Sequence, residues 1–405
     1  MNRRDFLRTF SAAGVAAGWP LERAGAAATA TPGVSTQSRS AFYELLDTLR
    51  DVDVRYLGPE RRIDRPEDIA DGHRFVLQVL WSALDLISEA DPERPVFRRT
   101  VWPELKFLGD NPDAVYYTAY IRSDRAYRIR GKTAGAVYTS FSLELGTADG
   151  HYSKGVARAI NDSELKPAAD GSYELILSPE PRPGNWFKLE PGTGSVQTRH
   201  YFEEERSVAA DPSKVIPLTI EALDVPGPRA ARDDTAIAAS IRRVITYVRA
   251  ITLDQPPMMQ QGKVPSWVST VPNQFNQPAI PSGDIGFANR DAAYAMAPYA
   301  LKPDEALVID GRFPKCRFAN VVLWNRYLQT YDYVTHTVSL NRKQTKAQPD
   351  GSFRMVVAHR TPGVPNWLDT QGHPSGLIYW RFALPEETVP PLKARVVPVS
   401  KVTST

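Results

Sequence analysis

Cysteine is nearly absent from this chain: Cys316 is the single one among 405 residues. One thiol cannot form an internal disulfide, which excludes a scaffold held together by disulfide bonds. Two roles remain open for Cys316, a nucleophile or a small packed side chain. Its position beside an expected strand favours packing.

Motifs of several large enzyme classes are missing as well. The six histidines show no His-Glu-x-x-His or His-x-His spacing, so we expect no metal site, although distant strands can still assemble one. There is no Gly-x-Ser-x-Gly elbow, phosphate-binding loop or dinucleotide fingerprint. The net charge is only +3, and no basic block indicates nucleic acid as a partner. The cofactor and the oligomeric state are left undetermined.

Long apolar runs are also lacking. Asn2-Arg3-Arg4-Asp5-Phe6-Leu7-Arg8 is typical of a twin-arginine export signal, and a short apolar stretch and small residues at 24–28 follow it. The stretch is too short to cross a bilayer, which takes about 20 residues. We therefore expect residues 1–30 to be a removable signal peptide and the protein to be periplasmic, with no transmembrane anchor. A cytoplasmic protein with a basic N-terminus is the alternative.

What the chain does contain is an internal repeat with an offset of about 180 residues. The matching segments, in order, are Asn111–Tyr116 with Asn289–Tyr294, Asp170-Gly171-Ser172 with Asp350-Gly351-Ser352, Asn185-Trp186 with Asn366-Trp367, and Arg199 with Arg381. We expect residues kept in both copies to hold the unit together. Polar residues present in one copy only are the better candidates for function.

The residue pattern predicts helices followed by strands in each copy. Apolar residues at helical spacing predict helices over 38–56 and 66–90, and another after Pro226-Gly227-Pro228. Short apolar runs between turn residues predict strands, which favours β-sandwiches or jelly rolls over a parallel sheet. These strands include 137–145, 173–177, 306–309, 318–324, 334–340, 353–359 and 377–383.

This pattern divides the chain into five segments. They are the signal peptide (1–30), a helical N-terminal segment (38–95), a first β-sandwich (96–225), a linker and helix (226–258) and a second β-sandwich (259–400). The expected fold class is mainly β, with two related sandwich or jelly-roll domains and accompanying helices.

Three repeated features each have a structural and a functional interpretation. Asp-Gly-Ser predicts a hairpin turn, and lacks the further acidic ligands of a calcium loop. The repeated Asn-Trp either anchors its loop or lines a pocket, and recurrence favours anchoring. Arg199 and Arg381 lie in expected strands, where each forms a structural ion pair or binds an anion in a cavity. The sequence does not decide between the ion pair and the anion-binding role of these arginines.

Features confined to the second copy carry the functional hypothesis. Asp369 and His373 follow Asn366-Trp367, and a carboxylate beside an imidazole can orient a general base, although an Asp that caps a turn is the common case. Trp324-Asn325 and Tyr333 can stack on sugar rings or flat apolar ligands, or fill the core.

Several of these motifs, taken in order, resemble the bacterial domain-of-unknown-function family 1214. They are 305–312, 321–325, Asp350–Ser352, 366–370, Gly372-His373 and Arg381. The resemblance is strong over 285–385 and weak over 110–205. It implies an exported or envelope protein with a jelly-roll sandwich, often preceded by another β-rich domain, and it implies no particular reaction.

We expect the second sandwich to hold a pocket that binds or processes a small molecule or glycan. Asp369 and His373 are the candidate catalytic pair, and the candidate binding residues are Arg381, Asn366, Trp367, Trp324, Asn325 and Tyr333. The rival hypothesis is a non-catalytic envelope protein that binds or assembles through its surface. It predicts an exposed apolar patch in place of a pocket with converging polar groups.

Overall fold

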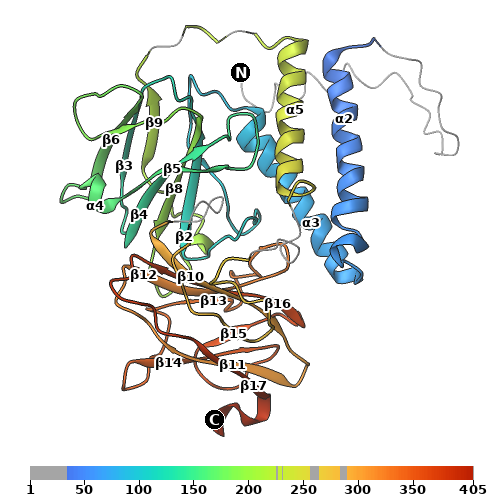
Figure 1. Cartoon of the computed structure of the whole chain (residues 1–405), viewed down its shortest axis with the longest axis vertical. Helices are drawn as coiled ribbons and strands as arrows, with labels where there is room; N and C mark the ends of the chain where they lie inside the picture. The colour runs from blue at the N-terminus through green and yellow to red at the C-terminus, as the bar shows by residue number, and fades with distance from the viewer. Residues whose placement is uncertain (1–33, 225–226, 230, 256–263, 283–289, 405) are drawn as a thin grey trace, which may run out of the picture. The chain divides into compact units, whose positions relative to one another are not determined.

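Three long helices and two β-rich halves make up the described part of the chain (Figure 1). The computed structural model describes residues 34–224, 227–229, 231–255, 264–282 and 290–404. The expected signal peptide, residues 1–30, lies outside these residues, so export stays a prediction. Shorter helical segments are α4 (Asp162–Leu165) and 3-10 turns at Pro59–Arg61, Val208–Ala210 and Val399–Ser404.

Helices α2 and α3 confirm the two helices expected near the N-terminus. α2 spans Gln37–Asp51 and α3 spans Pro66–Ala83; each continues as a π-helical turn, Val52–Tyr56 after α2 and Leu84–Ser88 after α3. Pro66 occupies the first helical position, where the missing proline N–H leaves no hydrogen bond unmade. The periodicity of the apolar residues therefore placed both helices to within a few residues.

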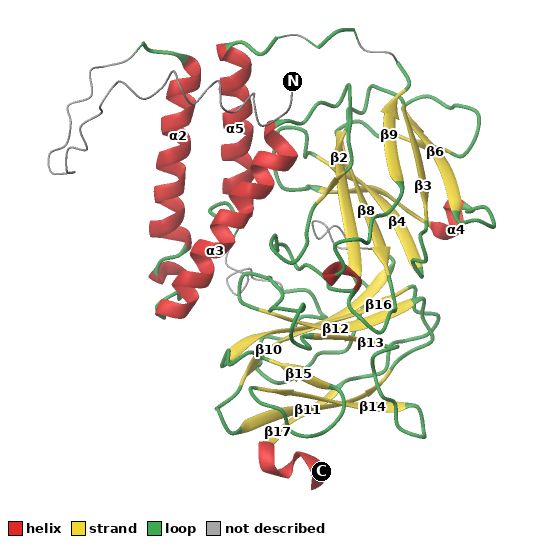
Figure 2. Cartoon of the chain, turned by 180° about the vertical axis from the view of Figure 1, so that it is seen from behind, coloured by secondary structure: helices red, strands yellow, loops and turns green. Residues whose placement is uncertain are grey.

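The third long helix, α5 (Asp234–Ile251), packs against α2 and α3, and Figure 2 shows the three side by side. Asp233 caps α5 by accepting a hydrogen bond from the backbone N–H of Ala236 at 2.8 Å. On the exposed side of α5, Arg242 forms an ion pair with Glu44 of α2 at 2.9 Å. The buried residues of α5 are mostly apolar, so the helices present an apolar face to the rest of the molecule.

The first β-rich half is a sandwich of two sheets. Its strands are β1 (Arg98–Arg99), β2 (Ala114–Tyr120), β3 (Tyr127–Lys132), β4 (Tyr138–Leu145), β5 (Gly155–Asn161), β6 (Ser172–Ser178), β7 (Trp186–Lys188), β8 (Thr193–Tyr201) and β9 (Leu218–Ala222). The strand order is β1-β2-β8-β4-β5 in one sheet and β7-β6-β3-β9 in the other. Neighbouring strands are antiparallel, except for the parallel pair β6 and β7.

The second half has the same construction. Its strands are β10 (Ala292–Ala300), β11 (Glu305–Arg312), β12 (Phe318–Trp324), β13 (Ser339–Asn341), β14 (Ser352–Ala358), β15 (Trp367–Asp369), β16 (Ser375–Ala383) and β17 (Lys393–Pro398). The orders β10-β16-β12-β13 and β15-β14-β11-β17 reproduce those of the first half without β1. The parallel pair recurs as β14 and β15.

Strand register agrees with the sequence repeat. Tyr116 of β2 pairs with Arg199 of β8, and Tyr294 of β10 pairs with Arg381 of β16. The matched motifs therefore occupy the same positions in the two halves. The fold is mainly β, with two related sandwich domains, as the sequence predicted.

The central strands are buried on both faces. On β16, Trp380 and Phe382 belong to the core between the two sheets of the second sandwich. Tyr379, on the opposite face, belongs to a different apolar cluster, which also contains Tyr201 of β8 and Phe75 of α3. One sheet of each sandwich therefore contributes its outer face to a shared interior that the helices complete.

Two local expectations were only partly correct. Asp170-Gly171-Ser172 and its repeat form tight turns, with Gly171 at φ 77° and Asp170 accepting a hydrogen bond from the Ser172 backbone N–H at 3.0 Å. The strand that follows pairs with β3, which is distant in sequence, so the turn does not close the hairpin that we predicted. The strand expected over 334–340 is reduced to Ser339–Asn341, because Asp332 holds the preceding residues in a turn.

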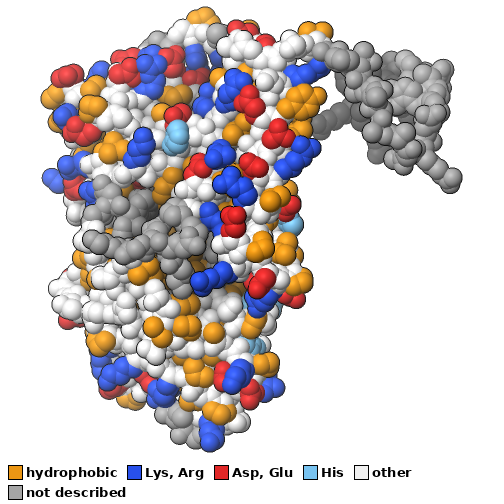
Figure 3. All heavy atoms as spheres, turned by 45° about the vertical axis from the view of Figure 1, so that its right-hand side comes forward, with side chains coloured by type: hydrophobic (Ala, Val, Ile, Leu, Met, Phe, Trp, Pro, Cys, Tyr) orange, Lys and Arg blue, Asp and Glu red, His pale blue; other side chains and the backbone are white. Residues whose placement is uncertain are grey.

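The outer surface carries mixed charge. On the face shown in Figure 3, basic and acidic side chains are interspersed. Exposed ion pairs such as that between Arg242 and Glu44 occur on the surface of the molecule. Within the described residues, no helix has the combined length and hydrophobicity needed to span a membrane.

Candidate functional site

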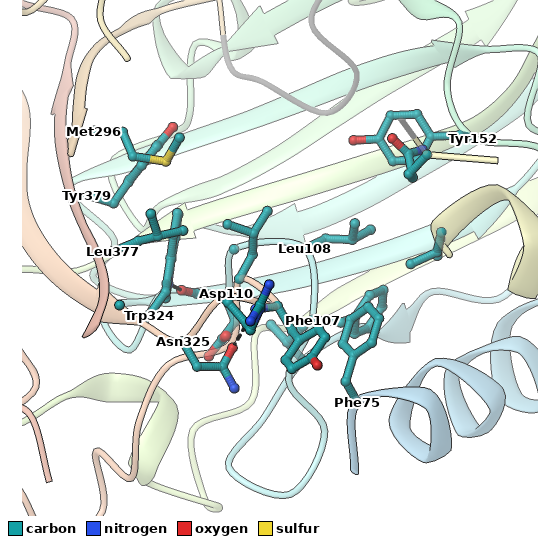
Figure 4. Close-up of a pocket in the computed structure, with 18 of the residues that line it drawn as sticks. Phe75, Phe107, Leu108, Asp110, Tyr152, Met296, Trp324, Asn325, Leu377 and Tyr379 are labelled. Carbon is teal, nitrogen blue, oxygen red and sulfur yellow. Dashed lines mark hydrogen bonds between the residues drawn. The ribbon is translucent and has the colours of Figure 1, made fainter. Parts of the chain in front are cut away.

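A large cavity lies where the two outer sheet faces and the helices meet. Its volume is about 870 Å³, and it is lined by residues of α3, α5, β2, β8, β10 and β16 and by several loops. Figure 4 shows Tyr379, Leu377 and Trp324 on one side of this space and Tyr152 on the other. Each wall comes from a different segment of the chain, so the cavity exists only in the assembled fold.

The arginines of the repeat meet at this cavity. Arg199 and Arg381 occupy equivalent positions on β8 and β16, both are buried, and both line the cavity. Nη2 of Arg199 donates to Oε1 of Gln197 at 3.0 Å, and Nη1 of Arg381 donates to Oδ1 of Asn320 at 3.3 Å. Arg381 forms no ion pair with a residue that the structure describes, which favours the cavity interpretation for this arginine over a structural salt bridge.

Tyrosines surround the two arginines. Tyr116 and Tyr201 contribute from the first sandwich, with ring centroids 6.3 Å apart, and Tyr294 and Tyr379 from the second, with centroids 5.3 Å apart. Burial raises the pKa of Tyr116 and of Tyr379 well above the ordinary range, so both phenols stay neutral at physiological pH. The guanidinium of Arg381 lies 5.0 Å from the Tyr379 centroid, within cation–π range.

Trp324 forms a rigid apolar wall. Its ring lies 4.3 Å from that of Tyr379, and its Nε1 donates to the carbonyl oxygen of Asp110 at 2.9 Å. Gly109, at φ 79°, lies so close that a Cβ atom would come within 2.9 Å of the indole. Any other residue there would push the ring towards the cavity, so Gly109 and Asp110 together fix the position of Trp324.

Asn325 also lines the cavity, but its polar atoms serve the turn that follows β12. Its Oδ1 accepts hydrogen bonds from the backbone N–H groups of Tyr327 at 2.9 Å and of Gln329 at 3.1 Å. Tyr333 is not one of the described residues that line the cavity. It is buried, and the ammonium group of Lys106 lies 4.4 Å from its ring centroid. The two residues therefore hold loops in place.

The candidate pair Asp369 and His373 is not joined by a hydrogen bond or an ion pair in the structure. Oδ1 of Asp369 accepts the backbone N–H of Gln371 at 2.8 Å, which is the turn-capping role. The His373 ring stacks on Tyr331 at 4.4 Å and lines the cavity, and burial lowers its pKa. His373 therefore reaches the cavity, whereas Asp369 does not line it.

Asn366 and Trp367 have the loop-anchoring role that the recurrence of Asn-Trp in both copies favours. Asn366, at φ 57°, brackets its loop by hydrogen bonds with the backbone N–H and carbonyl of Lys346, each at 2.8 Å. Nε1 of Trp367 donates to the carbonyl oxygen of Ala358 at 3.2 Å, as Trp186 does to Ser178 at 3.3 Å in the first copy. Both tryptophans anchor their loops to the preceding strand, and neither lines the cavity.

The lone thiol is a packed side chain. Cys316 is buried, and its Sγ lies 3.4 Å from the carbonyl oxygen of Phe318, to which it donates. Burial raises the pKa of this thiol to about 11. Within the described residues, no group of three or more His, Cys, Asp or Glu side chains is placed to hold a metal ion.

Comparison with known proteins identifies the family of the first sandwich. Residues 119–204 match the family model described as "Protein of unknown function (DUF1214)". Over these residues the chain is similar to that family. The match lies in the first copy, from the end of β2 to β8, whereas the sequence motifs had pointed more strongly to 285–385. The second copy shares the topology of the DUF1214 domain.

A solved structure shares the architecture of this chain. An uncharacterized protein from Burkholderia cenocepacia has 28% sequence identity and a TM-score of 0.78, with 90% of this chain and 99% of that chain covered. A protein from Vibrio parahaemolyticus covers 80% of this chain and 98% of its own at 10% identity, with a TM-score of 0.46. No curated protein matches the chain.

Sequence reasoning missed most of the residues that line the cavity. Tyr116 and Tyr294 were recognised only as parts of the repeat, and Tyr379, Trp267 and Met296 were not singled out. A signal was present in β16, where Leu377, Tyr379 and Arg381 alternate with the apolar residues of the sandwich core. Large side chains on both faces of a strand indicate that both faces are covered.

Proposed function

We propose that this protein binds a small, largely apolar organic molecule in the cavity between its two sandwiches and its helices. The observation that carries the proposal is the cavity of about 870 Å³ itself. Ligand pockets typically enclose roughly 300–1,000 Å³ and combine apolar walls with a few fixed polar groups. Here the walls are aromatic and aliphatic, and the polar groups converge from equivalent strands of the two repeats.

The site differs from the pocket expected in the second sandwich alone. Arg381, Trp324 and His373 line it, as the sequence hypothesis requires, but Tyr116 and Arg199 come from the first sandwich and Phe75 from α3. Because Asp369 caps a turn and has no bond to His373, the geometry supports binding more directly than hydrolysis. We therefore propose a binding function without a catalytic pair.

Export forms part of the proposal and rests on the twin-arginine signature at residues 2–8. A periplasmic protein meets ligands that enter from outside the cell, which suits a cavity for small molecules. Sequencing the N-terminus of protein recovered from the periplasm tests this point. A chain that remains cytoplasmic and begins at Met1 would contradict export.

The rival hypothesis, an envelope assembly protein, draws support from another observation. Leu77, Trp81 and Leu84 are exposed on α3 and the π-helical turn that follows it, at a spacing that places them on one face. The cavity with converging polar groups is the feature that favours ligand binding over this alternative.

The neutral fluorescent probe N-phenyl-1-naphthylamine tests the binding function. We expect the probe to gain fluorescence with the wild-type protein, and Leu377→Trp, which fills the cavity beside Trp324, to weaken its binding at least tenfold. Val396→Trp is the matched control, because Val396 is exposed on β17 and does not line the cavity. Absence of probe binding, or equal binding by both variants, would count against the proposed site.

A further inference from the structure

Arg381 is a buried cation that forms no ion pair with any residue that the structure describes. Its exposed fraction is 5%, and Nη1 donates to the neutral amide of Asn320 at 3.3 Å. Nε and Nη2 donate to no residue that the structure describes. A buried guanidinium normally receives a carboxylate or a full set of acceptors, because its loss of hydration is otherwise uncompensated.

The nearest candidate counter-ion, Asp113, is occupied by other donors. Its Oδ1 accepts from Nδ2 of Asn341 at 3.0 Å, and its Oδ2 accepts from Nδ2 of Asn320 at 2.9 Å. Asn320 thus stands between the carboxylate and Arg381, and turns its own oxygen towards the guanidinium. Asp113 and Arg381 form no ion pair.

The two repeats differ at the position that supplies the counter-charge. Register places Glu144 opposite Ser195 on β8, and Trp324 opposite Leu377 on β16, so Glu144 and Trp324 are equivalent. Burial lowers the pKa of Arg199, whereas Tyr201 and the Glu144 carboxylate raise it, with a net increase. The second repeat has an indole where the first has this carboxylate, so Arg381 has no equivalent of Glu144 beside it. The carboxyl of Asp113, whose pKa burial raises and Arg381 lowers, is separated from the guanidinium by Asn320.

Aromatic rings hold the guanidinium of Arg381 and leave its donors available. Its Cζ lies 5.0 Å from the Tyr379 centroid and 5.9 Å from the Tyr201 centroid. Contact with a ring stabilises the charge through the π face, while the N–H bonds lie in the guanidinium plane. An arginine held in this way can still bind a carboxylate or sulfonate through two parallel hydrogen bonds.

A second donor without an acceptor lines the same cavity. Trp267 is 6% exposed, and its Nε1 has no hydrogen-bond partner among the described residues. Its ring lies 6.0 Å from that of Tyr379, which also contacts Arg381. Buried indole N–H groups normally have a partner, so this independent feature also indicates a missing acceptor.

Acidic and basic side chains both line the α3 part of the cavity, where Arg61 and Arg62 accompany the carboxylates. Asp68 is paired there with Arg65 and Arg326, at 2.7 and 3.0 Å. The charges at that end therefore have partners of opposite sign, in contrast to Arg381. An amphiphilic ligand can place an anionic group at Arg381 and its apolar body along Trp324, Leu377 and Met296.

We propose that the ligand is an organic acid, with an apolar or aromatic body and a single carboxylate or sulfonate group that binds Arg381. This inference rests on the proposed binding function and names the class of its ligand. The acid supplies the negative charge that Glu144 provides in the first repeat and that is missing in the second, where Trp324 takes its place. The oxygens of the acid accept hydrogen bonds from Arg381 and Trp267. Neutral molecules of the same shape lack this contact.

A matched pair of probes tests the inference. 8-Anilino-1-naphthalenesulfonate carries a sulfonate on the skeleton of N-phenyl-1-naphthylamine, so the two differ by the anionic group alone. At fixed ionic strength, we expect the sulfonate to bind the wild type at least tenfold more tightly than the neutral probe. Arg381→Gln should abolish this preference, while neutral probe binding stays within a factor of two. Arg381→Lys, which keeps the charge but not the bidentate geometry, should retain part of the preference.

The control is Arg50→Gln, which removes the same charge from an arginine on α2 whose side chain is 77% exposed, and it should change neither affinity. Equal wild-type affinities, or a sulfonate preference that survives Arg381→Gln, would overturn the acid inference and leave the binding function standing. Failure of both probes to bind would overturn the binding function itself.

If Arg381→Gln does not fold, displacement of the sulfonate from the wild type by dodecanoate but not by dodecanol supports the inference. Equal displacement by the two overturns it.

Discussion

Asp113 and Asp291 occupy equivalent positions in the two repeats, and each carboxylate accepts a hydrogen bond from the other repeat. Nδ2 of Asn341 donates to Asp113 at 3.0 Å, and Nδ2 of Asn161 donates to Asp291 at 3.1 Å. The two asparagines are themselves equivalent, since each pairs with the same position of the adjoining strand, Asn320 or Ser140. The contact between the repeats is therefore reciprocal.

Such reciprocity is the property of an interface between two copies related by a two-fold axis. In this chain the two copies are joined covalently, and they have diverged. The reciprocal contact brings β8 and β16 to one cavity, so Arg199 and Arg381 face the same space. Divergence at Glu144 and Trp324 then made the two ends of that space chemically different.

The buried carboxyl of Asp113 should make stability depend on pH. Burial raises its pKa to about 6, although the hydrogen bonds from Asn320 and Asn341 oppose this rise. A carboxyl whose pKa is higher in the folded state than the value of 3.8 in the unfolded state favours folding fully below pH 3.8. That contribution is lost as the pH rises through about 6.

We therefore expect the wild type to lose about 2 kcal/mol of stability relative to Asp113→Asn between pH 4 and pH 7. Urea unfolding of both proteins across this range measures it, and taking the difference removes the carboxyls that titrate in both. A difference that grows with pH would contradict the raised pKa.

Asp369→Ala should affect stability and spare ligand binding. The variant loses the hydrogen bond to the backbone N–H of Gln371, a residue at φ 51°, and we expect the free energy of unfolding to fall by about 1 kcal/mol. Both fluorescent probes should bind within a factor of two of the wild type. A tenfold loss of probe binding with unchanged melting temperature would restore Asp369 to the site.

Cys316 should react slowly in the native protein. Burial raises the pKa of its thiol from 9.0 to about 11, so at pH 8 the thiolate fraction is roughly a hundredfold smaller than in the unfolded chain. Colour development with a disulfide reagent, followed before and after unfolding in guanidinium chloride, measures the ratio. Comparable rates in the two states would indicate an accessible, reactive thiol instead.

Much of the fold could be predicted from local patterns. The helices around Leu49 and Val79, and strands such as β12, follow from periodicity because burial of one face repeats at the spacing of the element. The prediction that Asp170-Gly171-Ser172 closes a hairpin was wrong, because strand pairing does not depend on local residues alone. The turn chemistry is local, but the strand that pairs with β6 is distant in sequence.

The site was predicted only in part. Arg381, Trp324, Asn325 and His373 line the cavity, while Asp369, Asn366, Trp367 and Tyr333 hold loops. The comparison of the copies treated shared residues as scaffold. That reasoning left Arg199 and Arg381 undecided, because a surface on which two repeats meet brings equivalent residues to one cavity, and recurrence alone does not show this.

The sequence by itself determined the duplication, the positions of most helices and strands, and the two alternatives for the repeated arginine. These properties depend on residues close along the chain or on direct comparison of its two halves. Only the tertiary structure decided that the outer faces of two sheets and α3 enclose one cavity, and that Arg381 lies in it without an ion pair to the part of the chain that the structure describes. Burial, and therefore the cost of an unpaired charge, depends on which distant segments pack together, and the strand pattern does not specify that packing.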